Sequence, residues 1–339
     1  MITIRKASWG IISIVLAVSF AATAQPFYLP TANRSLFERG QDEKFLVGTA
    51  ATNWMTGGFG CVRTGGWQMH EGLDIRCLQR DGRGEPIDPV RAAADGTIVY
   101  INRRPSLSNY GNYIVLRHQI DQLEVYSLYA HLREFAGGLA PGQAVKAGQQ
   151  IAIMGRTSNT RQAISRERAH VHFEINFLVN DRFSSWHQQS RSGERNDHGE
   201  WNGHNLLGID PLAVLLAHQS QRERFSLLSF VRQQPELCRV HVRSINFPWL
   251  KRYPQLITGN SRADKEGIAG YELALNFNGL PFELIPRASS ELRSKSRFQL
   301  LSVNEHEQQK NPCCRLVSRK GSRWELTSHG VQLLELLTY

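Results

Sequence analysis

The sequence predicts a mainly β protein in which a domain of short antiparallel strands is followed by a second, β-rich domain. Between about residues 49 and 218, short runs of alternating apolar and polar residues are separated by Gly, Asn and Pro. No long helical period interrupts these runs, which favours antiparallel pairing over a parallel sheet with crossover helices. A further series of short apolar runs over residues 225–339 indicates the second domain.

The N-terminal residues have the pattern of an export signal. Two basic residues precede an almost wholly apolar run over 11–22, and residues 22–24 are the small side chains of a cleavage point. The run is shorter than the about 20 apolar residues that span a bilayer. We therefore expect a cleaved signal peptide over 1–24, the alternative being an uncleaved anchor. The protein is then exported, periplasmic or secreted, has no transmembrane anchor, and begins with a polar arm over 25–48.

The first domain, over 49–218, contains five predicted strands. They are residues 96–101, 112–117, 124–131, 150–155 and 170–175. Two polar stretches, 156–169 and 180–205, are too long for tight connections, so we expect surface loops there. Residues 210–216 predict a short helical turn that closes the domain, and 219–224 predict a linker.

The second domain, over 225–339, has no chemical motif that indicates its role. Its predicted strands are residues 239–245, 271–277, 282–286, 298–303 and 315–318. The apolar residues 331–337 predict a terminal helix.

Five cysteines suit an exported protein better than a cytosolic one, because disulfides persist outside the cytosol. Cys61 and Cys77 bracket the stretch around residue 70, so a bridge between them would hold that loop. Cys238 can pair with Cys313 or with Cys314, which leaves one thiol over. Buried free thiols are the alternative. A cysteine zinc site would need C-x-x-C pairs, and the sequence has none.

The formal net charge is +10, and removal of the signal peptide leaves +8. Residues 221–339 contain 18 Lys and Arg against 11 Asp and Glu, a net +7, so the C-terminal domain carries nearly all of this charge. A basic face can bind nucleic acid or anionic polymers. Because an exported protein rarely meets nucleic acid, we expect no nucleic-acid partner and propose anionic envelope polymers, with solubility as the alternative purpose of the charge.

A histidine pair lies on a predicted strand. In His170-Val171-His172 the two imidazoles project from the same face, because alternate residues of a strand share a face. Neutral imidazole nitrogens bind zinc, although an H-x-H pair alone is weak evidence for a metal site.

A second cluster begins at His70. His70-Glu71-Gly72-Leu73-Asp74 starts like the helical zinc signature H-E-x-x-H, but aspartate replaces the second histidine and Gly72 disfavours a helix. We interpret it as H-x-G-x-D in a loop that leads into a strand, with His70 and Asp74 as ligands and Glu71 outside the site. Nitrogen and carboxylate ligands with one open position are typical of a catalytic zinc.

Seven blocks of the sequence, in order, resemble the lysostaphin-type zinc metallopeptidases. They are residues 69–74, 92–99, 110–118, 129–132, 145–155, 170–175 and 210–212. The resemblance implies an antiparallel β-sheet groove over about 69–216 and a zinc ion bound by His70, Asp74 and His172. It also implies that His131 and His170 are the catalytic pair, without saying which of the two takes the proton from the attacking water. The substrate that it implies is peptidoglycan, cut at peptide bonds of stem peptides or cross-links.

Two other functions stay open. One is a non-catalytic activator of cell-wall amidases with the same fold; such relatives lose metal ligands or catalytic histidines, whereas this chain has all five. The other is a secreted protease that acts on proteins.

The chain departs from the family pattern in its two long loops, 156–169 and 180–205, which we expect to border the groove and to influence substrate choice. We find no clear match for the tyrosine that many relatives place near the oxyanion. Glu174 is expected to position the strand or a metal ligand.

Overall fold

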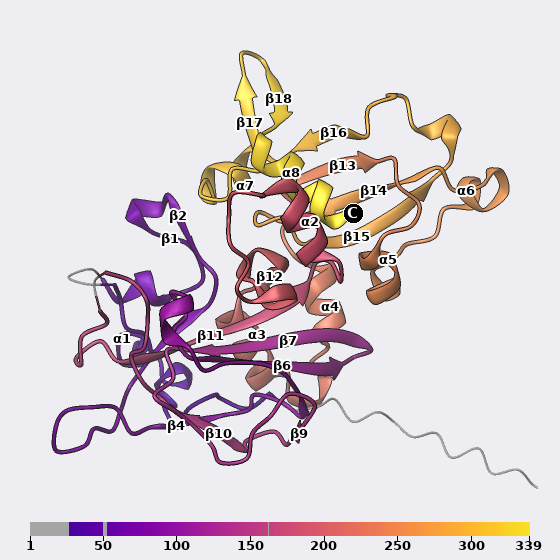
Figure 1. Ribbon diagram of the computed structural model, residues 1–339. Helices are drawn as coiled ribbons and strands as arrows, with labels where there is room; N and C mark the ends of the chain where they lie inside the picture. Colours follow the sequence, from indigo (N-terminus) through magenta and orange to yellow (C-terminus); the bar gives the residue numbers. More distant parts are fainter. Residues whose placement is uncertain (1–26, 50–52, 162) are drawn as a thin grey trace, which may run out of the picture.

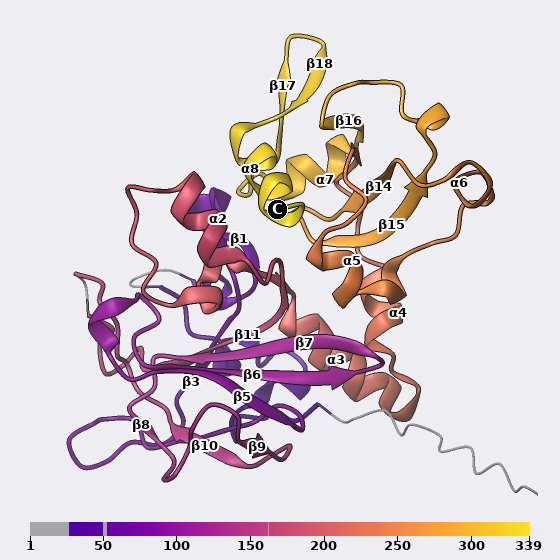
Figure 2. The same cartoon turned by 45° about the vertical axis from the view of Figure 1, so that its right-hand side comes forward.

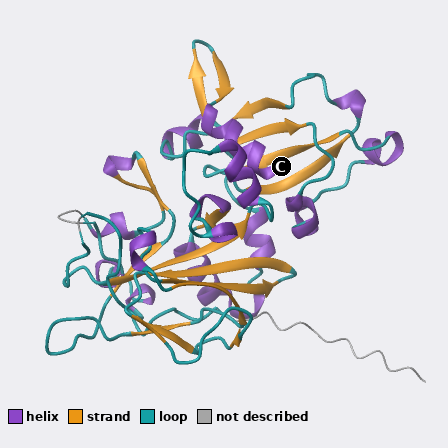
Figure 3. Cartoon of the chain, in the orientation of Figure 1, coloured by secondary structure: helices purple, strands orange, loops and turns teal. Residues whose placement is uncertain are grey.

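The computed structural model describes residues 27–49, 53–161 and 163–339 (Figure 1). The predicted signal peptide lies outside these residues. Within them, no helix is both long and apolar enough to cross a membrane. The fold is mainly antiparallel β-sheet with short helices (Figure 3), as predicted.

The largest sheet in the described residues has seven strands, in the order β12-β11-β7-β6-β5-β9, with β3 pairing beside β12 on β11. All of its pairs are antiparallel. The bounds are β3 Leu73–Arg76, β5 Gly96–Asn102, β6 Tyr113–Ile120, β7 Leu123–Ala130, β9 Ala144–Val145, β11 His170–Leu178 and β12 Leu206–Ile209. The central strand β11 is buried along its whole length, so its polar residues are held in fixed surroundings.

The hairpin between β6 and β7 shows how the sequence determines the pairing. Asp121 and Gln122 form its two-residue turn, and both have positive φ, 49° and 65°. Such turns have the twist that antiparallel strands require.

Smaller strands surround this sheet. β4 (Pro89–Arg91), β10 (Gln150–Ile153) and β8 (Glu134–Phe135) form a three-stranded sheet, and β1 (Gly60–Arg63) pairs with β2 (Gln68–His70) in a hairpin. All five predicted strands of the first domain are strands here; the shortest ones were not predicted because two or three residues carry no periodicity.

The C-terminal half forms a second antiparallel sheet in the order β15-β14-β13-β16, beside a β17–β18 hairpin. The bounds are β13 Cys238–Val242, β14 Gly270–Leu275, β15 Pro281–Arg287, β16 Phe298–Val303, β17 Val317–Lys320 and β18 Arg323–Leu326. Strands β13 to β17 and the terminal helix α8 (Ser328–Leu337) overlap the predicted elements, whereas β18 was not predicted.

The remaining helices are short. They are α1 Asp42–Phe45, α2 Phe183–Ser190, α3 Pro211–Gln221, α4 Leu227–Arg232, α5 Pro248–Arg252, α6 Ser261–Glu266 and α7 Glu305–Lys310. α3 begins as expected, with Pro211 in its first turn and Asp210 accepting a hydrogen bond from the Leu212 amide. It runs longer than predicted, so residues 219–221 of the expected linker are helical, and the expected loop 180–205 contains α2.

One continuous cluster of buried side chains includes residues of both halves of the chain. Figure 2 shows the C-terminal sheet above the sheet that contains β11. The Phe177 ring of β11 contacts Tyr253, whose hydroxyl accepts a hydrogen bond of 3.0 Å from the Leu178 amide. Asn278 donates 2.8 Å to the Gly208 carbonyl of β12. The C-terminal part therefore covers the β11–β12 side of the sheet that carries the site.

The cysteine pairing differs from both predicted bridges. Cys61 on β1 is joined to Cys313, with 5.4 Å between their Cα atoms, and Cys77, Cys238 and Cys314 are buried free thiols. The Cys77 thiol instead donates to Asp88, 3.1 Å away. The β1–β2 hairpin reaches toward the C-terminal residues (Figure 1), which brings together cysteines that are 252 residues apart.

Candidate metal centre

Three neighbouring strands position the predicted ligands. His70 ends β2, Asp74 lies on β3, and His172 lies on β11 directly opposite Asp74 in the strand register. Gly72 makes the passage between β2 and β3 possible, because a Cβ atom there would lie 2.3 Å from the Phe173 carbonyl oxygen. This is a steric reason for glycine in the H-x-G-x-D pattern.

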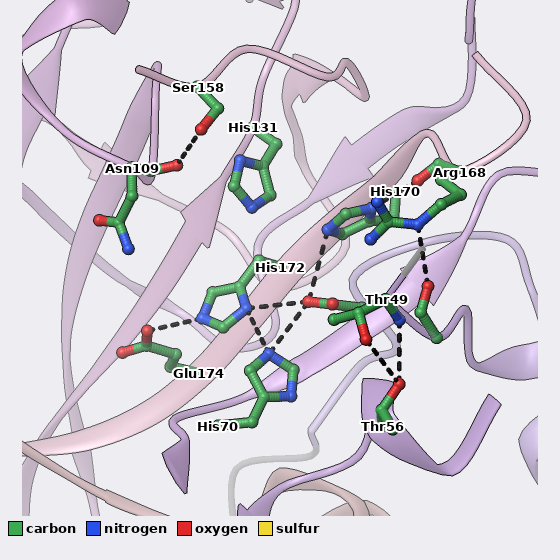
Figure 4. Close-up of polar contacts among 12 residues, drawn as sticks. Thr49, Thr56, His70, Asn109, His131, Ser158, Arg168, His170, His172 and Glu174 are labelled. Carbon is green, nitrogen blue, oxygen red and sulfur yellow. Dashed lines mark hydrogen bonds and ion pairs between the residues drawn. The ribbon is translucent and has the colours of Figure 1, made fainter. Parts of the chain in front are cut away.

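The three side chains converge on one point (Figure 4). His70 Nε2 lies 3.0 Å from His172 Nδ1, and Asp74 Oδ1 lies 3.1 Å from the first and 3.0 Å from the second. All three residues are buried. Three donor atoms at this spacing fit around an ion whose ligand distances are about 2.0–2.2 Å, as for zinc.

The outer hydrogen bonds determine which atoms face inward. His70 Nδ1 donates a hydrogen bond of 2.6 Å to the Gly58 carbonyl, and His172 Nε2 donates one of 2.7 Å to Glu174 Oε1. His70 Nε2 and His172 Nδ1 then carry lone pairs toward the centre. Arg63 donates a hydrogen bond of 2.7 Å to Oδ2 of Asp74, so that Oδ1 is the oxygen that faces the imidazoles. Three acceptors that face one another need a cation between them, so the donor set fits a metal.

The pKa shifts agree with a site that binds either a proton or a cation. Burial lowers the pKa of His70. Burial alone would lower that of His172 too, but its hydrogen bonds to Asp74 and Glu174 raise it to about 9. Burial opposes ionisation of Asp74, yet the imidazoles of His170 and His70 hold its pKa well below the usual range. A proton on His172 and a metal ion therefore compete for the same place.

The predicted catalytic pair lies beside this triangle. The rings of His131 and His170 have centroids 4.8 Å apart, and His170 Nε2 is 3.4 Å from Oδ1 of Asp74. His131 Nδ1 bonds the Thr157 carbonyl at 2.8 Å and His170 Nδ1 bonds the Arg168 carbonyl at 2.6 Å. Both imidazoles can therefore present an unprotonated Nε2, and burial lowers the pKa of both.

Two further residues of the site were not predicted from the sequence. Arg63, on β1, fixes Asp74, and nothing in the sequence around it indicated that role. Tyr110 has its ring centroid 5.5 Å from that of His172, and burial raises its pKa well above the usual range, so its hydroxyl stays protonated. Its place at the start of the family-like block 110–118 was the sequence feature that could have indicated Tyr110 as a site residue.

The centre opens into two adjoining hollows. The smaller hollow, about 160 Å³, is lined by all of the predicted site residues except His70. Residues of the 156–169 loop form another part of its wall. The larger, about 500 Å³, is lined by residues 187–204 and by the β5–β6 connection. Glu71 lines both and lies outside the donor triangle. Its side chain is exposed at the junction of the two hollows. The surrounding protein atoms and the nearby Glu174 carboxylate raise the pKa of Glu71.

Part of this chain is similar in sequence to known proteins. Residues 68–184 match the sequence model of Peptidase family M23. The Lipoprotein NlpD/LppB homolog of Pseudomonas aeruginosa is 35% identical over 108 residues, 32% of this chain and 29% of that protein. The DD-carboxypeptidase/endopeptidase Mpg of Neisseria gonorrhoeae is 33% identical over 108 residues (32% and 20%), and the Murein hydrolase activator NlpD of Escherichia coli is 36% identical over 110 residues (32% and 23%). The chain thus spans between a fifth and three tenths of the length of these relatives.

Solved structures are also similar in part. The catalytic domain of lysostaphin from Staphylococcus simulans aligns over 47% of this chain and 89% of its own, with 23% identity and a TM-score of 0.29. A zinc containing peptidase from Vibrio cholerae aligns over 32% and 26%, with 28% identity and a TM-score of 0.24. The segment matched by the family model includes His70, Asp74, His131, His170 and His172. Residues 68–184 of this chain are therefore a peptidase family M23 domain, the LytM/lysostaphin family.

Proposed function

We propose that the protein is a zinc-dependent endopeptidase that hydrolyses peptide bonds in peptidoglycan stem peptides or cross-links. One observation carries the proposal: the inward-facing donor triangle of His70, Asp74 and His172 stands next to two further imidazoles, those of His131 and His170, whose Nδ1 atoms bond backbone carbonyls. A purely structural metal site would have no use for that second pair.

When bound, zinc would supply Lewis acidity and an activated water. The residues of the chain do the rest. Nε2 of either His131 or His170 can accept a proton, since burial keeps both imidazoles neutral. The other can return a proton to the leaving amine. The Tyr110 hydroxyl, protonated and beside His172, can donate a hydrogen bond to a carbonyl oxygen on which negative charge develops.

The named relatives support a cell-wall substrate, because they include a DD-carboxypeptidase/endopeptidase and murein hydrolase activators. The expected export signal would bring this chain to the same compartment, periplasmic or secreted. The net +7 over residues 221–339 supports attraction to anionic envelope polymers, which would weaken as salt is added.

A second candidate is a non-catalytic activator of wall amidases. The Escherichia coli and Salmonella relatives named murein hydrolase activators favour it. The presence of all five predicted zinc and catalytic residues in this chain favours the enzyme.

Digestion of purified peptidoglycan sacculi separates the candidates. We expect zinc-loaded protein to release muropeptides with new amino groups, which mass spectrometry identifies bond by bond, and we expect a chelator to stop the release. Stimulation of an added amidase, without any release by the protein alone, would instead establish the activator.

A further inference from the structure

The last residues of the expected N-terminal arm lie against the metal centre. Residues 45–47 are buried, with no more than 4% of any of them exposed. Leu46 forms an antiparallel bridge with Ile75 of β3, on the edge opposite to the one that pairs with β11. Segment 45–48 therefore extends the sheet beyond β3, the strand that carries Asp74.

One backbone hydrogen bond joins this segment to a predicted metal ligand. The Val47 amide donates a hydrogen bond of 3.0 Å to the carbonyl oxygen of Asp74. Toward the other edge of β3, Asp74 stands opposite His172 in the register with β11. The strand is thus held on both edges where Asp74 lies, which limits the directions in which the Asp74 carboxylate can point.

A second contact reaches the residue that orients His170. The Gly48 carbonyl accepts a hydrogen bond of 3.0 Å from Arg168 Nε, and the Arg168 carbonyl lies 2.6 Å from His170 Nδ1. Thr49, the next residue along the chain, lines the smaller hollow (Figure 4). Segment 45–48 therefore contacts the surroundings of both a metal ligand and a predicted catalytic histidine.

Close packing of a glycine holds the segment in place. A Cβ atom on Gly57 would lie 2.4 Å from the Val47 carbonyl oxygen, so the turn over 54–57 can cover the segment only with glycine there. Gly58 follows this turn directly, and its carbonyl accepts the hydrogen bond of His70 Nδ1. The segment thus lies beside the backbone that orients a second ligand.

We propose that segment 45–48 positions the metal centre, so that zinc binding and the docking of this segment on β3 strengthen each other. This role rests on the metal site of the proposed function and not on hydrolysis. Val47 is a positioning residue, because its amide acts on the ligand only through the Asp74 backbone. Since coupling is reciprocal, a segment that raises zinc affinity must itself be stabilised when zinc binds.

Amide hydrogen exchange of the full chain, with and without zinc, tests this coupling. The control is the Tyr28 amide of the same arm, which donates a hydrogen bond of 2.7 Å to the Ala93 carbonyl and belongs to a residue that lines neither hollow. We expect zinc to slow exchange at Val47 by about 5- to 150-fold, the usual size of a coupling between two sites, and to leave Tyr28 unchanged.

A pair of variants measures the same coupling from the side of the metal. Val47→Pro has no amide hydrogen to donate, and Leu46 already has the extended conformation that a residue before proline needs, with φ −94° and ψ 149°. Val47→Ala is the matched control, because it loses the side chain and keeps the amide. Chelator competition should show weaker zinc binding in Val47→Pro by the same factor that zinc slows exchange at Val47. A merely structural segment would instead lower zinc affinity in both variants in step with their unfolding midpoints.

The outcomes separate this role from the proposed function. Exchange at Val47 that ignores zinc, or that slows only as much as at Tyr28, would overturn the coupling and leave the endopeptidase standing. Equal zinc affinity in Val47→Pro and Val47→Ala would overturn it as well. The exchange measurement uses the wild type, so it decides the matter even if Val47→Pro does not fold. Coupling in a protein that binds zinc but releases nothing from sacculi would support the positioning role and overturn only the endopeptidase, whereas a protein that binds no zinc would refute both.

Discussion

At the residue scale, the four histidines of the candidate site have different tasks that substitution can separate. His172 directs Nδ1 into the donor triangle, whereas His131 stands outside it with its ring centroid 6.0 Å from that of His172. We predict that His172→Ala abolishes zinc binding, while His131→Ala keeps zinc and lowers turnover by about 10²–10⁴-fold, the usual contribution of a general acid or base. Zinc content after dialysis and release of amino groups from sacculi check the two. Equal metal loss in both variants would refute these roles.

Glu174 would influence a bound metal ion through His172, because it lies outside the donor triangle. Its carboxylate accepts hydrogen bonds from His172 and, at 2.6 Å, from Asn176. A glutamine of the same size can accept from only one of these donors and carries no charge. We predict that Glu174→Gln weakens zinc binding by about 10–100-fold, the range found when a partner of a metal-binding histidine is lost. Competition with a chelator of known affinity measures it, and a variant as tight as the wild type would contradict the prediction.

At the scale of elements, the β6 and β7 strands hold a buried histidine away from the metal. His118 Nδ1 lies 2.8 Å from the Asp95 carbonyl oxygen, and its Nε2 lies 2.6 Å from the Ser127 hydroxyl oxygen. Burial lowers the pKa of His118 to about 4, whereas the Asp95 carbonyl raises it only partly.

This histidine should make the folded state sensitive to acid. Between the unfolded pKa of about 6.5 and the folded value, only the unfolded chain takes up the proton, so stability is full above that range and falls as the pH falls. The shift corresponds to a loss on the order of 3 kcal/mol. We predict that His118→Gln removes this share of the pH dependence. Denaturant midpoints at pH 8 and pH 4.5 test it, and identical pH slopes in both proteins would rule it out.

The same scale shows what the sequence could predict. Alternation along 170–175 predicted His170 and His172 on one face. In β11 they share a face because the strand is extended, paired with β3 on one edge and β7 on the other. Arg63 and the Cys61 bridge escaped prediction, since both depend on how the β1–β2 hairpin folds over. Three- and four-residue strands carry too little pattern to show that. The pairing of distant cysteines needs the packed C-terminal half, which local spacing does not encode.

At the scale of the whole molecule, one covalent bond joins the metal centre to the C-terminal half. Cys61 pairs with Met69 in the β1–β2 register, directly before His70, and the same hairpin carries Arg63. The disulfide to Cys313 and the edge contact of Phe59 with Phe277 attach it across the molecule. The C-terminal half thus helps to hold one ligand and the arginine that orients another.

We predict that breaking this bond loosens both the fold and the metal site. The paired variant Cys61→Ala/Cys313→Ala should lose about 2–4 kcal/mol of unfolding free energy, because a cross-link over 252 residues restricts the unfolded chain, and its zinc affinity should fall with it. Denaturant titration and chelator competition measure the two effects. Cys314→Ala, which removes the neighbouring free thiol 3.8 Å from Cys313 Sγ, is the control and should behave like the wild type. A reductant should give the wild type the zinc affinity and unfolding midpoint of the paired variant and leave that variant unchanged. If the reductant changes neither quantity in the wild type, the hairpin positions His70 without the disulfide.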